Sequence, residues 1–291
     1  MSRSGPGFPL VRTPKDSPPT RLSRVSAARL ERLAADLGEQ DASVLAFIAA
    51  ARLATGTQLV RRFWLKEGGN PDRQARNGRR ALKRLSDWRV LDPLPGRGRG
   101  GTRGGSDTII YSVGAAGARL LARRGLDRRR LGTPGDRHIS HTLTITELLV
   151  RLHEAEATGV LECIEAQTEP ECWRAFLGAM GARLTLKPDL LLRVAAPGSD
   201  FETRWAVEMD MATESPSTIR AKAQRYLEHY RSGREQQEHG VYPKVLWVVP
   251  DARRAEQIMG VLARLPAPAE RLFSVCQFHD TTALLITEAR S

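Results

Sequence analysis

The run RWAVEMD, residues 204–210, alternates apolar and other side chains, and this alternation limits how the surrounding chain can fold. Successive side chains of a β-strand point to opposite faces of its sheet. One face would carry Trp205, Val207 and Met209, and the other Ala206, Glu208 and Asp210. The flanking segments alternate between strand-like and helix-like patterns, which predicts a mixed sheet with helices on its faces.

The expected elements follow from this periodicity. We predict helices over residues 143–157, 215–230 and 252–265, and strands at LECIEA, CWRAF, RLTLKPDLLLRV, FETRWAVEMDM, KVLWVVP, RLFSVCQF and ALLIT.

The acidic residues on this sheet predict a metal site. Two carboxylates on one face repel each other and resist burial, whereas a divalent cation would relieve both costs. Mg²⁺ prefers such oxygen ligands, so we predict Asp189, Glu208 and Asp210 as its ligands. Ser215 and Pro216 favour a helix start, and Lys222 on that helix is expected to lean toward the sheet, where its ammonium can orient a water or a phosphate oxygen.

Charge divides the chain into two parts. The net charge is +12, but residues 1–137 hold 28 Lys and Arg against 12 Asp and Glu, and the remainder holds 17 against 21. This asymmetry favours a nucleic-acid-binding part joined to a part with another task. An arginine-rich composition spread over every surface is the alternative, but it does not explain why the second part is slightly acidic.

The basic part has the pattern of a winged helix-turn-helix. Three amphipathic helices are expected after Asp41, and the third begins at Asn70 and Pro71. Its outward face collects the cations Arg73, Arg76, Arg80, Lys83 and Arg84, as a helix that reads the major groove requires. Two strands, VLDPL and TIIYSV, then flank a glycine-rich loop with Arg97, Arg99 and Arg103, which we predict as wing contacts to double-stranded DNA. An ordinary solvated helix face and a disordered loop are the alternatives.

Other features set the class of protein. Residues 1–40 are expected to form a disordered basic tail without a secretory signal. No apolar run is long enough to span a membrane, and the three cysteines match neither a metal spacing nor a disulfide framework. A reduced, cytoplasmic protein without membrane partners is the simplest interpretation.

The pair Pro188–Asp189, followed by Glu208 on the next strand, resembles the PD-(D/E)xK nuclease signature. The resemblance implies that Asp189 and Glu208 bind Mg²⁺ and that a lysine helps to activate the attacking water. The chain departs from the pattern because Asp210 stands at the lysine position. Some members of that family carry the lysine on the following helix, where Lys222 lies.

Several longer runs resemble the replication-relaxation family of mobile-element proteins over roughly residues 41–260. They are RHISHTLTITELL, LKPDLLLRV, VEMDMATES, IRAKAQRYLEHY and YPKVLWVVPDARRAEQI. The resemblance implies a role in the replication or DNA transfer of a plasmid or integrative element, with replication or transfer proteins of that element as further partners.

These observations lead to one hypothesis and two alternatives. We expect an α+β protein with a winged helix over residues 41–131 and a restriction-endonuclease-like α/β domain over residues 138–291, which acts as a Mg²⁺-dependent DNA endonuclease or nickase. One alternative is a catalytically inactive DNA-binding initiator or regulator. The other is a relaxase with Tyr226 or Tyr230 as nucleophile, although the tyrosines lie on an apolar stripe.

Three further residues have two interpretations each. Glu214 either caps its helix through the dipole or joins the metal site. His138 and His141, spaced H-x-x-H, either ligate a metal or assist the site, or they have a boundary or capping role.

Overall fold

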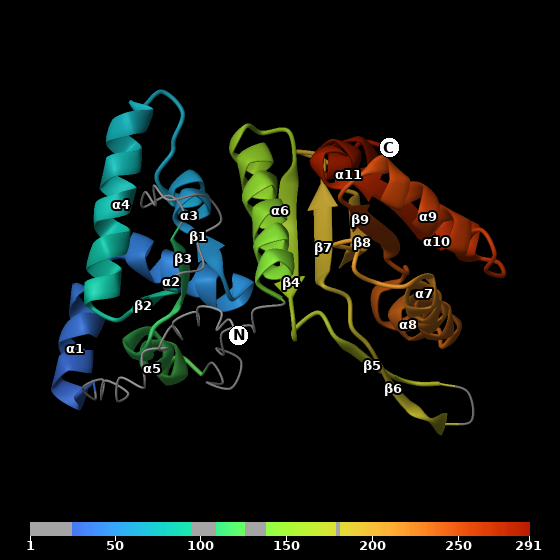
Figure 1. Cartoon of the computed structure of the whole chain (residues 1–291), viewed down its shortest axis with the longest axis horizontal. Coiled ribbons are helices and arrows are strands. Elements are labelled where there is room, and N and C mark those ends of the chain that lie inside the picture. Colours follow the sequence, from blue (N-terminus) through green and yellow to red (C-terminus); the bar gives the residue numbers. More distant parts are fainter. Residues whose placement is uncertain (1–24, 95–108, 126–137, 179–180) are drawn as a thin grey trace, which may run out of the picture.

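A computed structural model describes residues 25–94, 109–125, 138–178 and 181–291 of the chain. The described residues form two groups of elements on either side of the long helix α6 (Figure 1).

The first group combines five helices with a small antiparallel sheet. Its elements are α1 (Ala27–Asp36), α2 (Glu39–Ala51), β1 (Ala54–Thr55), α3 (Gly56–Phe63), α4 (Pro71–Asp87), β2 (Leu91–Leu94), β3 (Ile110–Val113) and α5 (Ala115–Arg123). The strand order is β1-β3-β2. The Asn70 side chain caps α4 and Pro71 is its first residue, as the sequence predicts.

This first group has its own core. Leu30, Ile48, Leu59 and Leu85 come from four different helices and are all buried in one apolar cluster. The prediction of a disordered tail up to residue 40 is wrong from Ala27 onward, because Leu30 and Leu33 of α1 lie in this core. Residues 1–24 lie outside the described part of the chain.

The second group is built on a five-stranded mixed sheet. Its strand order is β10-β9-β8-β7-β4, in which β4, β7 and β8 are antiparallel and β8, β9 and β10 are parallel. The strands are β4 (Glu162–Thr168), β7 (Leu190–Ala195), β8 (Glu202–Met209), β9 (Lys244–Val249) and β10 (Phe273–Gln277). A separate hairpin, β5 (Arg174–Leu177) and β6 (Arg183–Leu186), extends away from this sheet (Figure 1).

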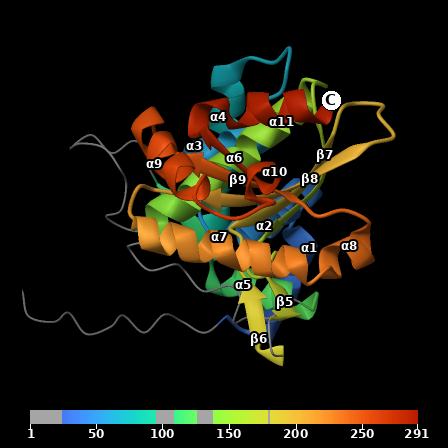
Figure 2. The ribbon, with the colours of Figure 1, turned by 90° about the vertical axis from the view of Figure 1, so that its right-hand side faces the viewer.

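Helices cover both faces of the sheet, as predicted. The helices are α6 (Ile139–Ala157), α7 (Pro216–Arg231), α8 (Arg234–His239), α9 (Ala252–Leu262), α10 (Ala269–Leu272) and α11 (Thr281–Ala289). Helices α6 and α11 share one apolar cluster with Trp205 and Val207. Helices α7 and α9 share another with Ala206, and α7 lies across that side of the sheet in Figure 2. The predicted alternation of faces along β8 is therefore confirmed.

Two predicted strands are wrong in detail. The run ALLIT is part of helix α11, in which Leu285 and Ala289, one turn apart, are buried against the sheet. A short apolar run fits a buried helix as well as a strand. The run RLTLKPDLLLRV forms two strands, since Pro188 lacks the N–H group that a continuous ladder needs.

None of the described helices is both long and apolar enough to cross a membrane.

Candidate active site and nucleic-acid interface

Two buried carboxylates lie side by side where β7 begins. Leu190 pairs with Val207, and the Asp189 N–H donates to the Val207 carbonyl at 3.1 Å. Asp189 therefore lies across from Glu208 on the face that α7 covers. Glu208 is 2% exposed and Asp189 is 9% exposed. Burial, reinforced by the negative charge of Asp189, raises the pKa of Glu208.

Helix α7 supplies both partners of the Glu208 side chain. The Tyr226 hydroxyl donates to Oε1 at 2.5 Å, and the Lys222 Nζ donates to Oε2 at 3.1 Å. These two residues are one helical turn apart, so they reach the strand side by side. The sequence did not indicate Tyr226 as a partner, because a tyrosine on an apolar stripe reads as core.

Lys222 lies between two acidic residues. Its Nζ is 2.7 Å from Glu214 Oε1 and 3.1 Å from Glu208. Burial would lower the pKa of Lys222, but Glu208 and Glu214 outweigh it, so the pKa is raised and the ammonium stays charged. Glu214 thus pairs with Lys222, and the Ser215 side chain caps α7.

Asp189 is held by one backbone group and one histidine. Its Oδ2 accepts the Met209 N–H at 2.7 Å and lies 3.2 Å from His141 Nε2. His141 comes from the first turn of α6, while His138 precedes that helix and makes no side-chain cap bond. Within the described part of the chain, no hydrogen bond reaches Asp189 Oδ1, so this oxygen is available to a ligand.

Asp210 is directed elsewhere. Arg254 binds both of its oxygens, at 2.7 and 2.8 Å, and the Asp210 side chain is completely buried. This ion pair neutralises the carboxylate and engages both of its oxygens, which argues against the prediction of Asp210 as a metal ligand. Among the described residues, no group of three or more His, Cys, Asp or Glu side chains could hold a metal ion. Asp189 and Glu208 remain as a pair.

A pocket of about 280 Å³ opens beside Glu208, between β6 and α7, whereas Asp189 lines a separate hollow of about 30 Å³ together with His141. Glu208 and Tyr226 form part of the wall of the larger pocket, and Lys187, Lys222 and Arg225 supply three cations. A small hollow lined by cations and a buried carboxylate has the chemistry to hold a phosphate group next to a bound divalent ion.

The comparison with protein families accounts for most of the chain. A model described as replication-relaxation matches residues 45–245. The chain belongs to the replication-relaxation family. The matched range includes Asp189, Glu208, Lys222 and all of α4, and it ends before Arg254. No curated protein and no solved structure matches the chain. Family membership points to a role in plasmid replication or relaxation.

In this replication-relaxation protein Tyr226 is a core residue and Tyr230 is half-buried at the edge of a small apolar cluster. Tyr226 is 1% exposed, and burial raises its pKa well above the ordinary value, with Glu208 adding to the effect. Tyr230 packs edge-on against Tyr242, with ring centroids 5.2 Å apart. Tyr226, buried and protonated, cannot attack DNA, and the half-buried Tyr230 ring is held by this aromatic packing, so the geometry disfavours the relaxase alternative.

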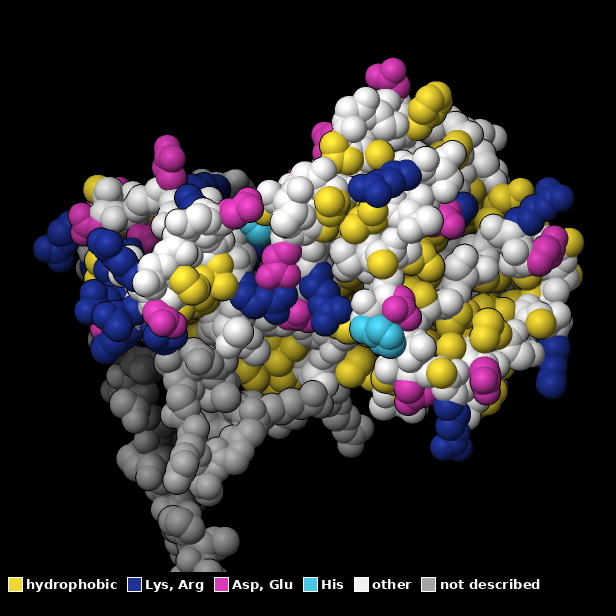
Figure 3. All heavy atoms as spheres, turned by 90° about the horizontal axis from the view of Figure 1, so that it is seen from above, with side chains coloured by type: hydrophobic (Ala, Val, Ile, Leu, Met, Phe, Trp, Pro, Cys, Tyr) yellow, Lys and Arg dark blue, Asp and Glu magenta, His cyan; other side chains and the backbone are white. Residues whose placement is uncertain are grey.

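The five predicted cations of α4 fall into two sets. Arg73, Arg76 and Arg80 are exposed and line an open hollow of about 500 Å³ together with Asn70, Asp72 and Asn77. The other two are in ion pairs: Lys83 with Asp87 at 2.8 Å, and Arg84 with the buried Asp41 at 2.7 Å. In Figure 3, Lys and Arg side chains gather at the end of the molecule that carries α4. Arg97, Arg99 and Arg103 lie outside the described residues.

Polar contacts join the first group of elements to α6. Arg61 of α3 binds Glu147 and Glu154, each at 2.7 Å, and the Thr146 hydroxyl donates to the Leu53 carbonyl at 2.7 Å. No local pattern predicts these contacts, because Glu147 lies opposite the apolar stripe of its helix, where a solvated side chain is expected. The same helix therefore contacts both the α4-bearing group and, through His141, the carboxylate pair.

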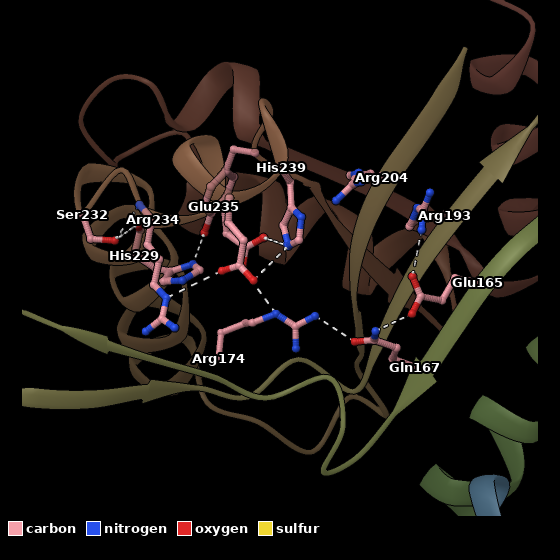
Figure 4. Close-up of polar contacts among 12 residues, drawn as sticks. Glu165, Gln167, Arg174, Arg193, Arg204, His229, Ser232, Arg234, Glu235 and His239 are labelled. Carbon is pink, nitrogen blue, oxygen red and sulfur yellow. Dashed lines mark hydrogen bonds and ion pairs between the residues drawn. The ribbon is translucent and has the colours of Figure 1, made fainter. Parts of the chain in front are cut away.

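A second polar cluster anchors the β5–β6 hairpin (Figure 4). Arg174 of β5 donates to Gln167 of β4 at 2.8 Å and lies 3.3 Å from Glu235 of α8. Arg193 of β7 similarly binds Glu165 at 3.2 Å. Acids and bases neutralise one another here, so the cluster fixes the hairpin to the sheet and to α8.

Proposed function

We propose that this replication-relaxation protein binds duplex DNA through a winged helix and cleaves DNA with a Mg²⁺-dependent nuclease site. The observation that carries the proposal is the buried pair of Asp189 and Glu208, with the charged Lys222 in hydrogen-bond contact with Glu208.

The order of elements supports the nuclease-like fold. Helix α6 precedes three antiparallel strands, β4, β7 and β8, and α7 then leads to the parallel strand β9. Asp189 directly precedes the second of these strands and Glu208 lies on the third. This agrees with the PD-(D/E)xK pattern, with the lysine carried by the following helix.

The residues fit a magnesium ion. Mg²⁺ is typically held by one or two carboxylates together with waters and substrate phosphates. Asp189 Oδ1 is available, and each Glu208 oxygen accepts one hydrogen bond, which leaves a lone pair on each. When bound, the ion would polarise the phosphoryl group and lower the pKa of an attacking water.

The protein side chains have separate tasks in this site. Lys187 and Arg225 would bind the phosphates that flank the scissile bond. Lys222, held between Glu208 and Glu214, would orient the attacking water or the scissile phosphate. Tyr226 would keep the Glu208 carboxylate in a fixed orientation.

The winged helix is supported by connectivity and charge. The order α2, β1, α3, α4, β2, β3, with sheet order β1-β3-β2, is that of three helices followed by a wing. Arg73, Arg76 and Arg80 are the α4 cations that would contact phosphates and base edges. Lys83 and Arg84, which are paired within the protein, would contribute less.

Cleavage assays test the nuclease. Supercoiled and branched DNA should be nicked in the presence of Mg²⁺ or Mn²⁺, and Asp189→Asn should abolish nicking. Glu165→Gln is the matched control, because it removes a carboxylate from the same face of the sheet outside the pocket. DNA binding without nicking would favour the second candidate, a non-catalytic initiator. The observation behind this candidate is that Asp210 stands where the nuclease pattern has its strand lysine.

Salt titrations test the DNA-binding surface. Each phosphate contact removed from duplex DNA reduces the slope of log K against log salt by about 1. Arg76→Gln and Arg80→Gln should each show this reduction, whereas Lys83→Gln, whose ammonium is paired with Asp87, should leave the slope unchanged. Equal effects of all three substitutions would refute the assignment.

A further inference from the structure

An exposed tryptophan contacts Lys187, one of the residues that line the Glu208 pocket. Trp173 is 36% exposed, whereas Trp205 and Trp247 are at most 1% exposed and Trp64 and Trp88 are partly buried in the first core. All five tryptophans of the chain lie within the described residues. Trp173 belongs to none of the apolar clusters of the described residues, and its indole N–H donates to Glu169 at 3.3 Å, which fixes the ring at the surface.

Lys187 links this tryptophan to the pocket. Its Nζ lies 4.2 Å from the centroid of the Trp173 ring, and the same residue lines the pocket that contains Glu208. Trp173 directly precedes β5 and Lys187 directly follows β6, so the two residues face each other at the base of the hairpin. A strand bound with its phosphates on Lys187, Lys222 and Arg225 would bring a base to the indole.

The base of the hairpin is held rigidly. Arg174, the neighbour of Trp173, binds Gln167 of β4 and Glu235 of α8 (Figure 4). Arg234 of α8 also donates to the Ala175 carbonyl at 2.6 Å. The indole is therefore preorganised, so little conformational entropy is lost when a base stacks on it.

The dimensions of the site select an unpaired strand. The pocket of about 280 Å³ has room for about one nucleotide, and Glu208 at its wall is only 2% exposed. A base inside a duplex stacks on its neighbours, and its face becomes available only when the strand is single or the base is displaced. We propose that Trp173 and Lys187 form a subsite for an unpaired nucleotide, so that the site takes a single-stranded DNA segment. This inference rests on the proposed function, because it names the substrate of the same site.

Binding measured without metal tests the subsite apart from cleavage. The full-length protein, kept in EDTA with excess unlabelled duplex to occupy the α4 surface, is titrated against a labelled oligothymidine. A second oligomer of equal length carries abasic sugars in place of the nucleotides. Stacking contributes about 1–3 kcal/mol per base, so the thymidine oligomer should bind about 5- to 150-fold more tightly than the abasic one.

Variants assign this difference to the indole. Trp173→Leu should lose the preference for bases, whereas Trp173→Phe should keep most of it because a phenyl ring still stacks. The matched control is Phe201→Leu, since Phe201 is 83% exposed and does not line the pocket; it should bind like the unaltered protein.

The results that overturn the subsite are distinct from those that overturn the nuclease. The subsite is refuted if the unaltered protein binds the two oligomers with equal affinity. It is also refuted if excess duplex abolishes binding of the thymidine oligomer. Equal losses in Trp173→Leu and Trp173→Phe would also refute stacking. Failure to cleave DNA with Mg²⁺ refutes the proposed nuclease and leaves the subsite standing.

Discussion

Replacing Arg254 with methionine should expose how much the protein depends on the buried ion pair with Asp210. The Asp210 side chain is fully buried and receives hydrogen bonds of 2.7 and 2.8 Å from the guanidinium. Arg254→Met leaves this carboxylate buried without a counter-charge, which typically costs about 3–5 kcal/mol. At about 2–4 °C per kcal/mol for a protein of this size class, the melting temperature should fall on the order of 10 °C.

A double-mutant cycle separates the pair from its surroundings. Asp210→Leu combined with Arg254→Met removes both charges, so the double variant should be more stable than Arg254→Met alone by at least about 1 kcal/mol. Urea denaturation followed by circular dichroism gives the free energies of unfolding, and unchanged m-values show that the unfolded state is comparable. Additive losses in the two single variants would refute a coupled buried pair.

Substitution of Asp210 tests whether its carboxylate has a structural role or binds a metal ion. Asp210→Asn should lower stability and leave Mn²⁺ affinity within about twofold, whereas Asp189→Asn should lose Mn²⁺ binding in calorimetric titration. If Asp210→Asn abolished Mn²⁺ binding while stability stayed constant, Asp210 would be a ligand and the role assigned to Arg254 would be wrong.

Three further outcomes are expected. Burial, aided by two nearby arginines, lowers the pKa of His229 from 6.5 to about 4. As the pH falls, the unfolded chain therefore takes up a proton before the folded chain does, and the free energy of unfolding should fall by up to about 3 kcal/mol between pH 6.5 and 4. Denaturation at each pH should show a smaller loss for His229→Gln. Arg61→Met should cost about 1 kcal/mol in thermal unfolding, more than Glu154→Gln, because Arg61 binds two carboxylates. Gly117→Ala should be destabilising by more than about 2 kcal/mol, since its Cβ would lie 2.3 Å from a backbone carbonyl, whereas Gly260→Ala, with open space around it, should be neutral or stabilising in the same assay.

Local signals predicted the elements well where several of them agreed. Asn70 with Pro71 and Ser215 with Pro216 mark the starts of α4 and α7, and both caps are present. The run ALLIT carried no cap or turn signal, and its helical state depends on packing against the sheet. The helix α1 was missed for a related reason, because its short apolar stripe lies in a segment of basic and proline-rich composition.

The candidate site was predicted in part. The alternation along β8 and the Pro–Asp pair indicated Glu208 and Asp189, which the fold brings together. The same alternation predicted Asp210 as a third ligand, but its carboxylate binds Arg254, 44 residues further along the chain. The sequence offered His138 and His141 as residues that could assist the site, and the fold brings His141 to Asp189 across 48 residues.

The sequence by itself determined the division into a basic and a slightly acidic part, the two-faced strand and the starts of the main helices. These properties depend on neighbouring residues, whose backbone preferences and periodicity act over one or two turns. Only the tertiary structure decided which charges are free. It paired Asp210 with Arg254 and Arg84 with Asp41, and it left Asp189 beside Glu208. The physical reason is that burial and ion pairing depend on distances between residues far apart in the chain, which are set when the elements pack.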